Sequence, residues 1–345
     1  MQEQREILER TSLLKDDGSL NAIGWSRRCI IDYNKDCIPK KLRWRKKEWD
    51  FYQCSDGEMM VQVTFANISV GAAATATVVN LRTGETHSQG AVIPFTFNSY
   101  ALTSKDAESE SDFVFDDGKI YLRFEVKKEY RNLVFIGGKG KKRIEIDLVC
   151  HHIENNESIT IVTPFKLQNR FFMTTKYNCM RTEGSVTVGD KTYTYDPDKT
   201  YSVLDWGRGV WPHKNYWYWG NGATVIDGKV FGFEITYGIG IEDNATETCL
   251  FYDGKAHKIG VVKVKVPPKK NGYMKDWEFV SEDGRFNLTM TPYYDNAGGM
   301  IALGIIGMKS HQVHGLFNGT VKLDDGTVLE VKDMYAFCEY VENRW

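Results

Sequence analysis

Hydrophobic and polar side chains alternate along most of this chain with a period of two residues, which is the pattern of a β-strand that buries one face. In residues 120–126, for example, apolar side chains alternate with Tyr121, Arg123 and Glu125. Further alternating runs lie at residues 61–65, 144–148, 230–237, 261–266 and 286–290. Only the first 15 residues have a pattern that allows a short amphipathic helix. The chain is therefore expected to be an all-β protein of half-buried antiparallel strands.

The dipeptide Asp-Gly recurs between these runs and predicts tight turns. Asp-Gly favours the positive φ angles of two-residue hairpin loops. The dipeptide occurs seven times, beginning at Asp17, Asp56, Asp117, Asp227, Asp253, Asp283 and Asp325. Strands that are joined by such turns form an antiparallel meander, so we expect a sandwich or a barrel.

The length of 345 residues favours about two domains, at the roughly 100–200 residues that are typical of one domain. No Pro- or Ser-rich linker and no short repeat marks a boundary. A polar run of Thr174, Thr175 and Lys176 precedes a new series of strands. We therefore expect a first β domain at residues 1–175 and a second at residues 176–345, packed closely together.

The charge of the chain is nearly balanced, with 44 Lys plus Arg against 46 Asp plus Glu and a formal net charge of −2. This balance argues against nucleic acid or another polyanion as a partner. One basic run, residues 39–49, contains Trp44 and Trp49, which could stack on bases or bind an anionic head group. Because the chain as a whole is nearly neutral, the alternative is favoured: a solvated strand or loop whose two tryptophans cover the core.

The cysteines, the histidines and the first residues predict a reduced cytoplasmic protein without a metal. Residues 1–25 are charged throughout and do not read as a signal peptide, and no apolar stretch is long enough for an integral membrane segment. The seven cysteines include no CxxC pair, which argues against a disulfide framework and a zinc ribbon. The pairs His151/His152 and His311/His314 lack further ligands at zinc spacing.

Common nucleotide-binding and nucleophile motifs are missing. Residues 137–143 lack the third glycine of a dinucleotide fingerprint and the Lys-Ser/Thr ending of a phosphate-binding loop. No GxSxG nucleophile elbow occurs either. Nucleotide-dependent and serine-hydrolase chemistry are therefore disfavoured.

The most informative segment is VLDWGRGVWPHKNYWYWGNG, residues 203–222, which holds four of the nine tryptophans. In a structural interpretation the tryptophans fill a barrel, the glycines allow bends, and Asp205 pairs with Arg208. In a functional interpretation the glycines let the backbone bend around a ligand, and Asp205 transfers protons. Burial among indole rings would raise the pKa of Asp205 toward the range of a general acid, whereas a nearby Arg208 would lower it.

Strand geometry limits which side chains of this segment can form an apolar wall. Trp217 and Trp219 lie on one face of a strand, and Tyr216 and Tyr218 lie on the other. Only one of these pairs can line a pocket, together with Trp211. The sequence does not determine which pair it is.

Other polar residues interrupt apolar runs elsewhere. Glu234 stands in the run FGFEITYG and could face a lumen, although a solvent-facing position on an amphipathic strand is favoured. Asn244 and Glu247 lie in a loop between two strands. Near the end of the chain, Glu339 and Arg344 are expected to form a structural ion pair.

Several of these strings together resemble a bacterial family with a domain of unknown function. They are LDWGRGVWP at 204–212, YWYWG at 216–220, GWSRR at 24–28, NATET at 244–248 and the whole of residues 314–345. This family is similar, more distantly, to hydroxyneurosporene synthase, a carotenoid hydratase, and to two-domain lipocalin-like proteins that include fungal pericyclases. The resemblance implies two lipocalin-like antiparallel β-barrel or sandwich domains, an apolar cavity, and no organic cofactor or metal.

The resemblance also implies a role for one residue. In the carotenoid hydratases an aspartate near a Trp/Gly-rich segment is the proposed proton donor and acceptor, and Asp205 matches it best. Two residues earlier the hydratases have a tyrosine where this chain has Val203. This difference speaks against hydration of a polyene in particular and leaves an acid in a dry aromatic cavity as the expectation.

The sequence thus predicts a cofactor-independent hydratase, isomerase or cyclase that acts on a hydrophobic unsaturated small molecule such as a terpenoid or lipid. Asp205 would protonate a double bond, aromatic walls would stabilise the carbocation, and His213 or Glu234 would relay the second proton. The candidate substrate contacts are Trp206, Arg208, Trp211, Tyr216, Trp217, Trp219, Asn244 and Glu247. Two alternatives stay open: a lipocalin-like carrier that holds such a ligand without turnover, and a purely structural Asp205–Arg208 pair that joins the domains. The oligomeric state is also open.

Overall fold

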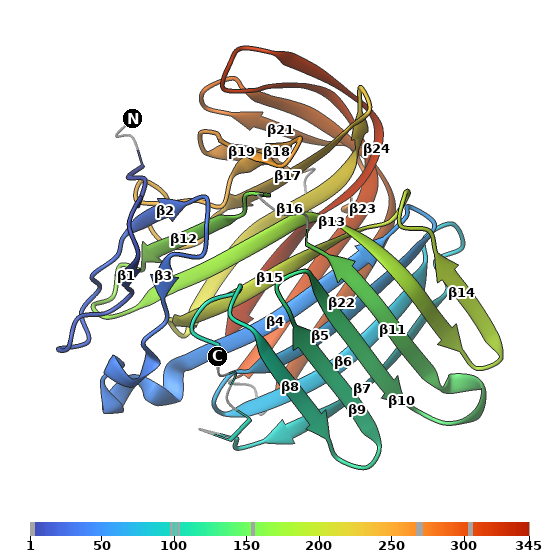
Figure 1. Ribbon diagram of the computed structural model, residues 1–345, viewed down its shortest axis with the longest axis horizontal. Coiled ribbons are helices and arrows are strands. Elements are labelled where there is room, and N and C mark those ends of the chain that lie inside the picture. The colour runs from blue at the N-terminus through green and yellow to red at the C-terminus, as the bar shows by residue number, and fades with distance from the viewer. Residues whose placement is uncertain are drawn as a thin grey trace.

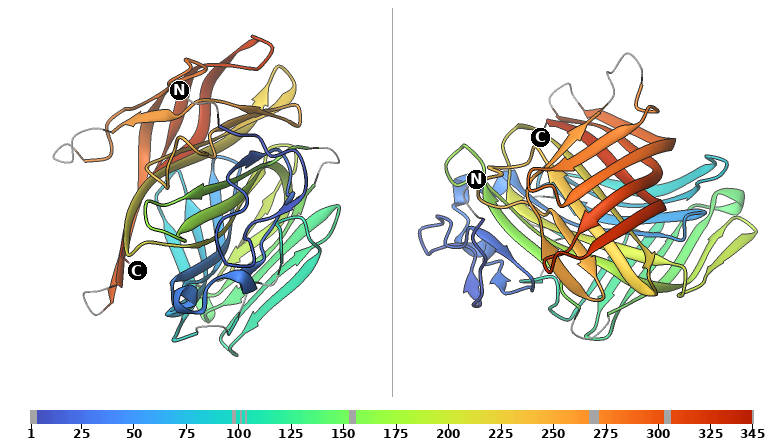
Figure 2. Two further views of the ribbon diagram at one scale, coloured as in Figure 1. Left: turned by 90° about the vertical axis from the view of Figure 1, so that its left-hand side faces the viewer. Right: turned by 90° about the horizontal axis from the view of Figure 1, so that it is seen from above.

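The chain folds into two curled antiparallel sheets that pack against each other, each shaped like half a barrel (Figure 1). The computed structural model describes residues 4–96, 99–100, 102, 104–152, 156–266, 272–302 and 306–344. Seen from above, the second sheet, in orange and red, lies across the first (Figure 2). The predicted all-β architecture of two lipocalin-like halves is confirmed.

The first sheet contains thirteen strands within the described residues. Its main path is formed by β4 (Lys46–Ser55), β5 (Met59–Asn67), β6 (Gly71–Asn80), β7 (Thr86–Pro94), β8 (Ser111–Asp116), β9 (Ile120–Val126), β10 (Tyr130–Gly137), β11 (Ile144–His151), β13 (Phe171–Val188) and β15 (Tyr201–Val210). Short strands beside this path are β2 (Gly24–Ser26), β12 (Ile159–Pro164) and β14 (Lys191–Tyr195). The strand order is β7-β6-β5-β4-β15-β13-β11-β10-β9-β8.

The second sheet contains nine strands in the part of the chain that the structure describes. They are β16 (Lys214–Ile226), β17 (Lys229–Tyr237), β18 (Cys249–Tyr252), β19 (Lys255–Lys258), β20 (Val262–Lys265), β21 (Trp277–Ser281), β22 (Phe286–Ala302), β23 (Ile306–Lys322) and β24 (Val328–Arg344). Their order is β19-β18-β17-β16-β24-β23-β22-β21-β20.

The chain passes from the first sheet to the second between Val210 and Lys214. Residue 175, where the sequence places a boundary, lies inside β13. Both β13 and β15 belong to the first sheet, because β13 pairs with β11 and β15 pairs with β4. The polar run at residues 174–176 therefore lies within a strand of the first sheet.

All seven Asp-Gly dipeptides lie at turns, and the φ angles of their glycines are between 70° and 90°. Six of them join neighbouring antiparallel strands, for example β4 to β5 and β16 to β17. At Asp227 and Asp253 the aspartate also has a φ of 51°, so both central residues are left-handed, as in a type I′ turn. The turn prediction is confirmed.

The N-terminal segment is extended, so the short amphipathic helix that the sequence allows does not form at residues 4–15. There β1 (Thr11–Ser12) pairs in parallel with β3 (Ile31–Asp32), and Glu6 forms a bridge with Trp25. An extended segment buries Ile7 and Leu13 against the first sheet, while its backbone groups form hydrogen bonds with neighbouring segments of the same chain. The helices among the described residues are three 3₁₀ turns: η1 (Lys35–Cys37), η2 (Lys40–Arg45) and η3 (Gly140–Lys142).

The basic run at residues 39–49 differs from its expected form. Most of it is the 3₁₀ turn η2, and its last part opens β4, where Lys47 is buried rather than solvated. Trp44 is 49% exposed and carries the guanidinium of Arg45 on its ring. Of the two tryptophans, only Trp49 turns inward, because it is the one on the strand.

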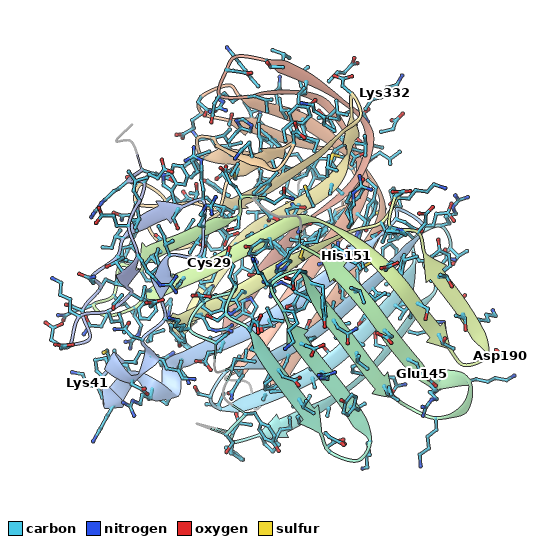
Figure 3. All side chains as sticks on the ribbon, viewed as in Figure 1. Cys29, Lys41, Glu145, His151, Asp190 and Lys332 are labelled. Carbon is cyan, nitrogen blue, oxygen red and sulfur yellow. The ribbon has the colours of Figure 1, made fainter. Side chains whose placement is uncertain are left out.

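Each sheet has its own apolar core, and a third cluster, which includes Phe172 and Trp211, lies between the sheets. Figure 3 shows charged side chains on the outside and a thiol within the molecule; the labelled examples are Lys41, Glu145, Asp190, Lys332 and Cys29. All seven cysteines are free thiols. No helix in the described ranges is long and apolar enough to cross a bilayer.

Candidate functional site

A cavity of about 400 Å³ lies between the two sheets. Its aromatic lining consists of Trp49, Phe51, Phe172, Trp211, Trp217 and Trp219. Its ionisable and amide side chains include Gln62, Lys176, Asp205, Glu247, Gln312 and Glu339. Small residues of β5 and β6, such as Ala66 and Ala73, leave the space open. The volume is typical of a small-molecule site, and both sheets are needed to build it.

Side chains of β15 point alternately into the cavity and into the core of the first sheet. Asp205 faces the cavity, whereas Trp206 and Arg208 face the opposite way. Arg208 Nη2 donates to Asp50 Oδ1 at 2.8 Å, and its guanidinium lies 3.9 Å over the ring of Trp206. The predicted pair of Asp205 and Arg208 is wrong, because an odd separation along a strand places them on opposite faces.

The alternation of β16 places its tryptophans, not its tyrosines, at the cavity. Trp217 and Trp219 line it. On the other face Tyr216 is 47% exposed, and Tyr218 stacks on Tyr340 with 4.7 Å between ring centroids. The question that the sequence left open is thus answered in favour of the indole pair.

Gly207 provides the space that Trp49 needs. The two residues are direct partners between β15 and β4. A Cβ atom on Gly207 would lie 2.0 Å from Trp49 Cε2, so any larger residue would displace the ring. In this position Trp49 Nε1 donates to Asp205 Oδ2 at 2.9 Å. The glycine of the WGRG string therefore serves close packing of an indole against the strand.

Asp205 is almost buried and accepts hydrogen bonds on both carboxyl oxygens. Oδ1 lies 2.7 Å from Lys176 Nζ and 3.0 Å from Thr174 Oγ1, and Oδ2 accepts from Trp49. Both Lys176 and Thr174 lie on β13, directly beside β15. A cation and two neutral donors are the surroundings of a carboxylate that acts as an acceptor.

Lys176 holds three groups of the site together. Its side chain is 2% exposed, and Nζ lies 3.4 Å from Glu247 Oε2 and 4.2 Å from the ring centre of Trp219. Burial alone would lower the pKa of Lys176, but Asp205 and Glu247 outweigh it and raise the pKa above its ordinary value. The ammonium group is therefore charged and balanced by two carboxyl groups.

Glu234 and Glu247 are completely buried beside this cluster. Trp219 Nε1 and Asn178 Nδ2 each donate to the carboxyl group of Glu234 at 2.9 Å. Burial raises the pKa of both glutamates, against the opposing charge of Lys176. The expected solvent-facing position of Glu234 is wrong, because its face of β17 packs against the first sheet.

Glu339 on β24 lines the cavity from the second sheet. Trp217 Nε1 donates to its Oε1 at 2.9 Å, and Gln312 Nε2 lies 3.3 Å from Oε2. Burial raises the pKa of this carboxyl group to about 7. The expected ion pair with Arg344 does not form, since the side chain of Arg344 is exposed on the opposite face of the strand.

The remaining predicted residues do not line this cavity. His213 is half-buried in the segment between β15 and β16. Asn244 lies in a turn closed by a bond from its backbone N–H to the carbonyl of Ile241, whereas Glu247, three residues later, reaches the cavity wall. Their proposed roles remain predictions. In the described ranges no group of three or more His, Cys, Asp and Glu side chains is arranged to hold a metal ion.

Sequence reasoning missed several site residues, among them Lys176, Glu339, Gln62 and Gln312. A signal existed for the first two. Lys176 is the only charge in the run FFMTTKYNCM, and Glu339 is the only charge in AFCEYV, the same feature that marked Glu234. Nothing in the sequence marks the two glutamines, because they meet only where the sheets cross.

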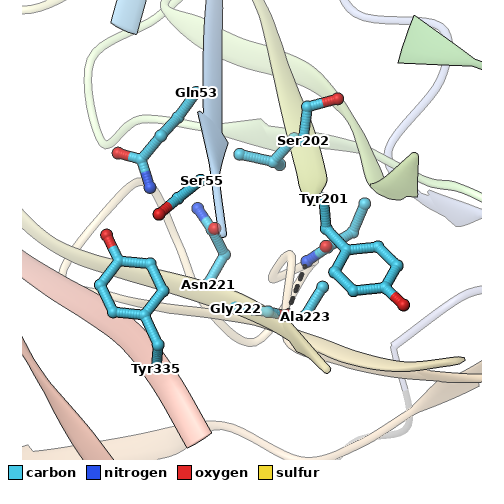
Figure 4. Close-up of a pocket in the computed structure, with 10 residues that line it drawn as sticks. Gln53, Ser55, Tyr201, Ser202, Asn221, Gly222, Ala223 and Tyr335 are labelled. Atoms are coloured by element: carbon cyan, nitrogen blue, oxygen red, sulfur yellow. Dashed lines mark hydrogen bonds between the residues drawn. The ribbon is translucent and has the colours of Figure 1, made fainter. Parts of the chain in front are cut away.

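A second, smaller pocket of about 30 Å³ lies farther along the contact between the sheets (Figure 4). The polar side chains of its lining include Gln53, Ser55, Tyr201, Asn221 and Tyr335. The hydroxyl group of Tyr335 is directed toward the side chains of β4. A volume of this size accommodates about one water molecule.

Fold and site together define a class of protein: two packed half-barrels that enclose an aromatic cavity with a buried cluster of charges. The chain belongs to the family described as Domain of unknown function (DUF2804), which it matches over residues 4–345. The predicted relation to a family with a domain of unknown function is thus confirmed. A search of curated proteins found no match.

Several solved structures resemble the chain, and two of them do so over most of its length. One is kievitone hydratase from Nectria haematococca, at 12% identity and a TM-score of 0.49, covering 87% of this chain and 88% of that one. The other is a protein assigned as AttH from Nitrosomonas europaea, at 13% identity and a TM-score of 0.49, covering 87% and 92%. Similarity at this level does not transfer a reaction, so the chemistry follows from the residues of this chain.

Proposed function

We propose that this protein is an enzyme that carries out acid–base chemistry on a hydrophobic, unsaturated small molecule bound between the two sheets. The proposal rests on one observation: Lys176, Asp205 and Glu247 form a buried charged cluster in the wall of an otherwise aromatic cavity. Ionised groups are costly to remove from water. A protein that only stores an apolar ligand gains nothing from this cost, whereas a protein that moves protons requires such groups.

The size of the cavity supports a ligand of moderate length. A space of about 400 Å³ lies in the lower part of the range of small-molecule sites, roughly 300–1,000 Å³. This fits a small terpenoid or a medium-chain lipid better than a long polyene. Val203 stands where the carotenoid hydratases have a tyrosine, and this difference also favours a substrate other than a carotenoid.

Asp205 acts in this proposal as the anion of the site. Because Lys176 and two neutral donors hold its carboxyl group, it stabilises positive charge that develops on the ligand and can accept a proton from it. The ring faces of Trp217 and Trp219 add cation–π attraction. Attack by water, loss of a proton or ring closure would complete a hydration, an isomerisation or a cyclisation.

Native mass spectrometry of the freshly purified protein, followed by extraction of any bound apolar compound, tests where and what the protein binds. Thr75→Trp fills the cavity from β6, and Thr77→Trp, two residues along the same face and outside the lining, is the matched control. We expect an unsaturated lipid or terpenoid on the wild type and on Thr77→Trp, and its loss from Thr75→Trp. A nucleotide on the wild type, or equal retention by both variants, would contradict the proposal.

A lipocalin-like carrier is the second candidate, because the same apolar wall suits storage. Asp205→Asn separates the two functions, since it preserves the shape of the side chain and removes its charge. For an enzyme we expect turnover to be abolished while ligand affinity stays within a few fold. A carrier has no turnover to lose.

A further inference from the structure

Two carboxyl groups, those of Asp205 and Glu339, face the same cavity from opposite sheets in unlike surroundings. Asp205 is bound to the ammonium group of Lys176. Glu339 has only neutral donors, Trp217 and Gln312, and no Lys or Arg of the described residues lies within ion-pair distance of it. Unlike surroundings of this kind give two carboxyl groups of one site different roles.

We propose that Glu339, and not Asp205, is the general acid that delivers the proton to the ligand, and that His314 positions it through Gln312. This inference rests on the proposed function, because it names the proton donor of the same cavity. Glu339 is half-buried, and the cavity is where its accessible surface lies. Among the described residues, the one hydrogen-bond partner of Oε2 is a donor, Gln312 Nε2, so no protein acceptor competes with the ligand for a proton on Oε2.

The orientation of the Gln312 amide is fixed by its neighbours. Its Oε1 accepts from Gln62 Nε2 at 2.5 Å and lies 3.2 Å from His314 Nε2. The amide nitrogen is therefore left to face Glu339. Because Gln62 belongs to the first sheet, this arrangement forms only when the two sheets are packed together.

His314 faces this amide from a buried position on β23. Burial lowers the pKa of His314 to about 3, so the ring is neutral and carries one N–H. Its Nδ1 lies 2.9 Å from the hydroxyl of Tyr335, which lines the small polar pocket (Figure 4). When Tyr335 donates to Nδ1, the N–H must be on Nε2 and directed at Gln312.

The charges around Glu339 are compatible with a proton that is present near neutral pH. Asp205 and Lys176 line the opposite wall, Glu247 lies between β17 and β18 of the second sheet, and the strands on either side of Glu339 present neutral side chains. Burial raises the pKa of Glu339 to about 7, Asp205 raises it further, and Lys176 and the two hydrogen bonds oppose the increase. The carboxyl group is thus both acidic enough and protonated enough to act as a general acid.

In the proposed step the proton on Glu339 Oε2 moves to one carbon of a carbon–carbon double bond. The π electron pair of that bond forms the new C–H bond and leaves the neighbouring carbon positively charged. Asp205 and the indole faces stabilise this cation. A water molecule then adds and releases a proton, or an adjacent carbon loses one, and the returned proton restores Glu339.

The test uses 1-methoxycyclohexene, a small vinyl ether whose hydrolysis begins with proton transfer to carbon and gives cyclohexanone and methanol on addition of water. We expect the wild type to accelerate this reaction, with a rate that falls as the pH rises through about 7. In Glu339→Gln the rate of this reaction should fall about 100-fold or more, and its dependence on pH should disappear. Glu330→Gln, an exposed glutamate of the same strand, is the matched control and should match the wild type.

The outcomes separate the two proposals. Catalysis that survives Glu339→Gln but is lost in Asp205→Asn would overturn the inference and leave the proposed function intact. No acceleration by the wild type would contradict the proposed function itself. A second measurement needs no substrate: in protein labelled with carboxyl-¹³C glutamate, Glu339→Gln should remove a resonance that titrates near pH 7, and an ordinary glutamate midpoint for Glu339 would overturn the inference.

The positioning role of His314 has its own readout. His314→Leu removes the donor that fixes Gln312, so the amide can turn away and Glu339 loses a hydrogen bond to its charged form. The midpoint of the pH–rate profile should then rise, and His314→Gln, which retains an N–H donor, should restore it. A purely structural histidine would change protein stability without moving the midpoint.

Discussion

At the scale of single residues, the site depends on contacts between neighbouring strands that leave no spare room. The side chain of Trp49 packs across β15 at Gly207 and donates to Asp205. The glycine, which has no side chain, therefore determines where the indole ring lies and which carboxyl group it contacts. Lys176 lies beside the same aspartate on the next strand. The surroundings of Asp205 are therefore built by three neighbouring strands, β4, β15 and β13.

Gly207→Ala tests this packing. The added methyl group would have to displace Trp49, so we expect a loss of roughly 1–3 kcal/mol in unfolding free energy and weaker binding of the ligand. Unfolding in urea and native mass spectrometry measure the two effects. Adding Trp49→Phe should recover stability but not binding, because phenylalanine cannot donate to Asp205. A Gly207→Ala protein as stable as the wild type would show that the indole is not seated there.

Glu339 predicts a pH dependence of stability. Its pKa of about 7 in the folded protein lies above its ordinary value, so the folded state holds the proton more tightly than the unfolded state. Stability from this group is complete below about pH 4.5 and decreases as the pH rises through about 7, by roughly 3 kcal/mol in total. Glu339→Gln lacks this decrease. Urea unfolding of both proteins at pH 4.5, 6 and 8 measures it, and parallel profiles would contradict the assignment.

Sequence reasoning identified some site residues and missed others for a physical reason. Asp205 stood out because it lies beside tryptophans and glycines in one segment. The partner of its carboxyl group could not be found that way, because Lys176 is close in space only through strand pairing. Arg208, three residues away in the chain, was the nearest cation in sequence and lies on the wrong face.

At the scale of elements, the hairpins are the part of the fold that local sequence determines. Each Asp-Gly turn adopts the left-handed glycine conformation that its dipeptide favours, and the alternating runs become strands with one buried face. The N-terminal segment shows where local pattern fails. Its apolar residues fit a helix, but extended pairing with β3 and Trp25 satisfies its backbone within the fold.

Gly228→Ala tests the turn argument alone. The φ angle of Gly228 is 75°, and an added Cβ would meet no atom within 4 Å, so the cost is purely conformational. We expect a loss of about 1 kcal/mol, a smaller loss for Gly228→Asn, and unchanged ligand binding. Urea unfolding checks the order of the three proteins. An alanine variant without any loss would mean that this turn tolerates an ordinary residue.

At the scale of the whole molecule, the site belongs to neither sheet by itself. The first sheet contributes Asp205 and Lys176, and the second contributes Trp219 and Glu339. The sequence predicted two β-barrel-like halves and an aromatic cavity, but not which surfaces meet. The long strand β13 explains the difficulty, because it extends through the first sheet and also contacts β16 and β17 of the second.

The most direct test of acid–base catalysis between the sheets is the identity of the compound that co-purifies with the wild type and with Asp205→Asn. If the protein is an enzyme, the variant should retain its substrate, and the compound from the wild type should differ from it by the elements of water or by the position of a double bond. High-resolution mass spectrometry with NMR of the extracted compounds distinguishes these cases. The same compound on both proteins, bound equally well, would contradict catalysis and leave a carrier.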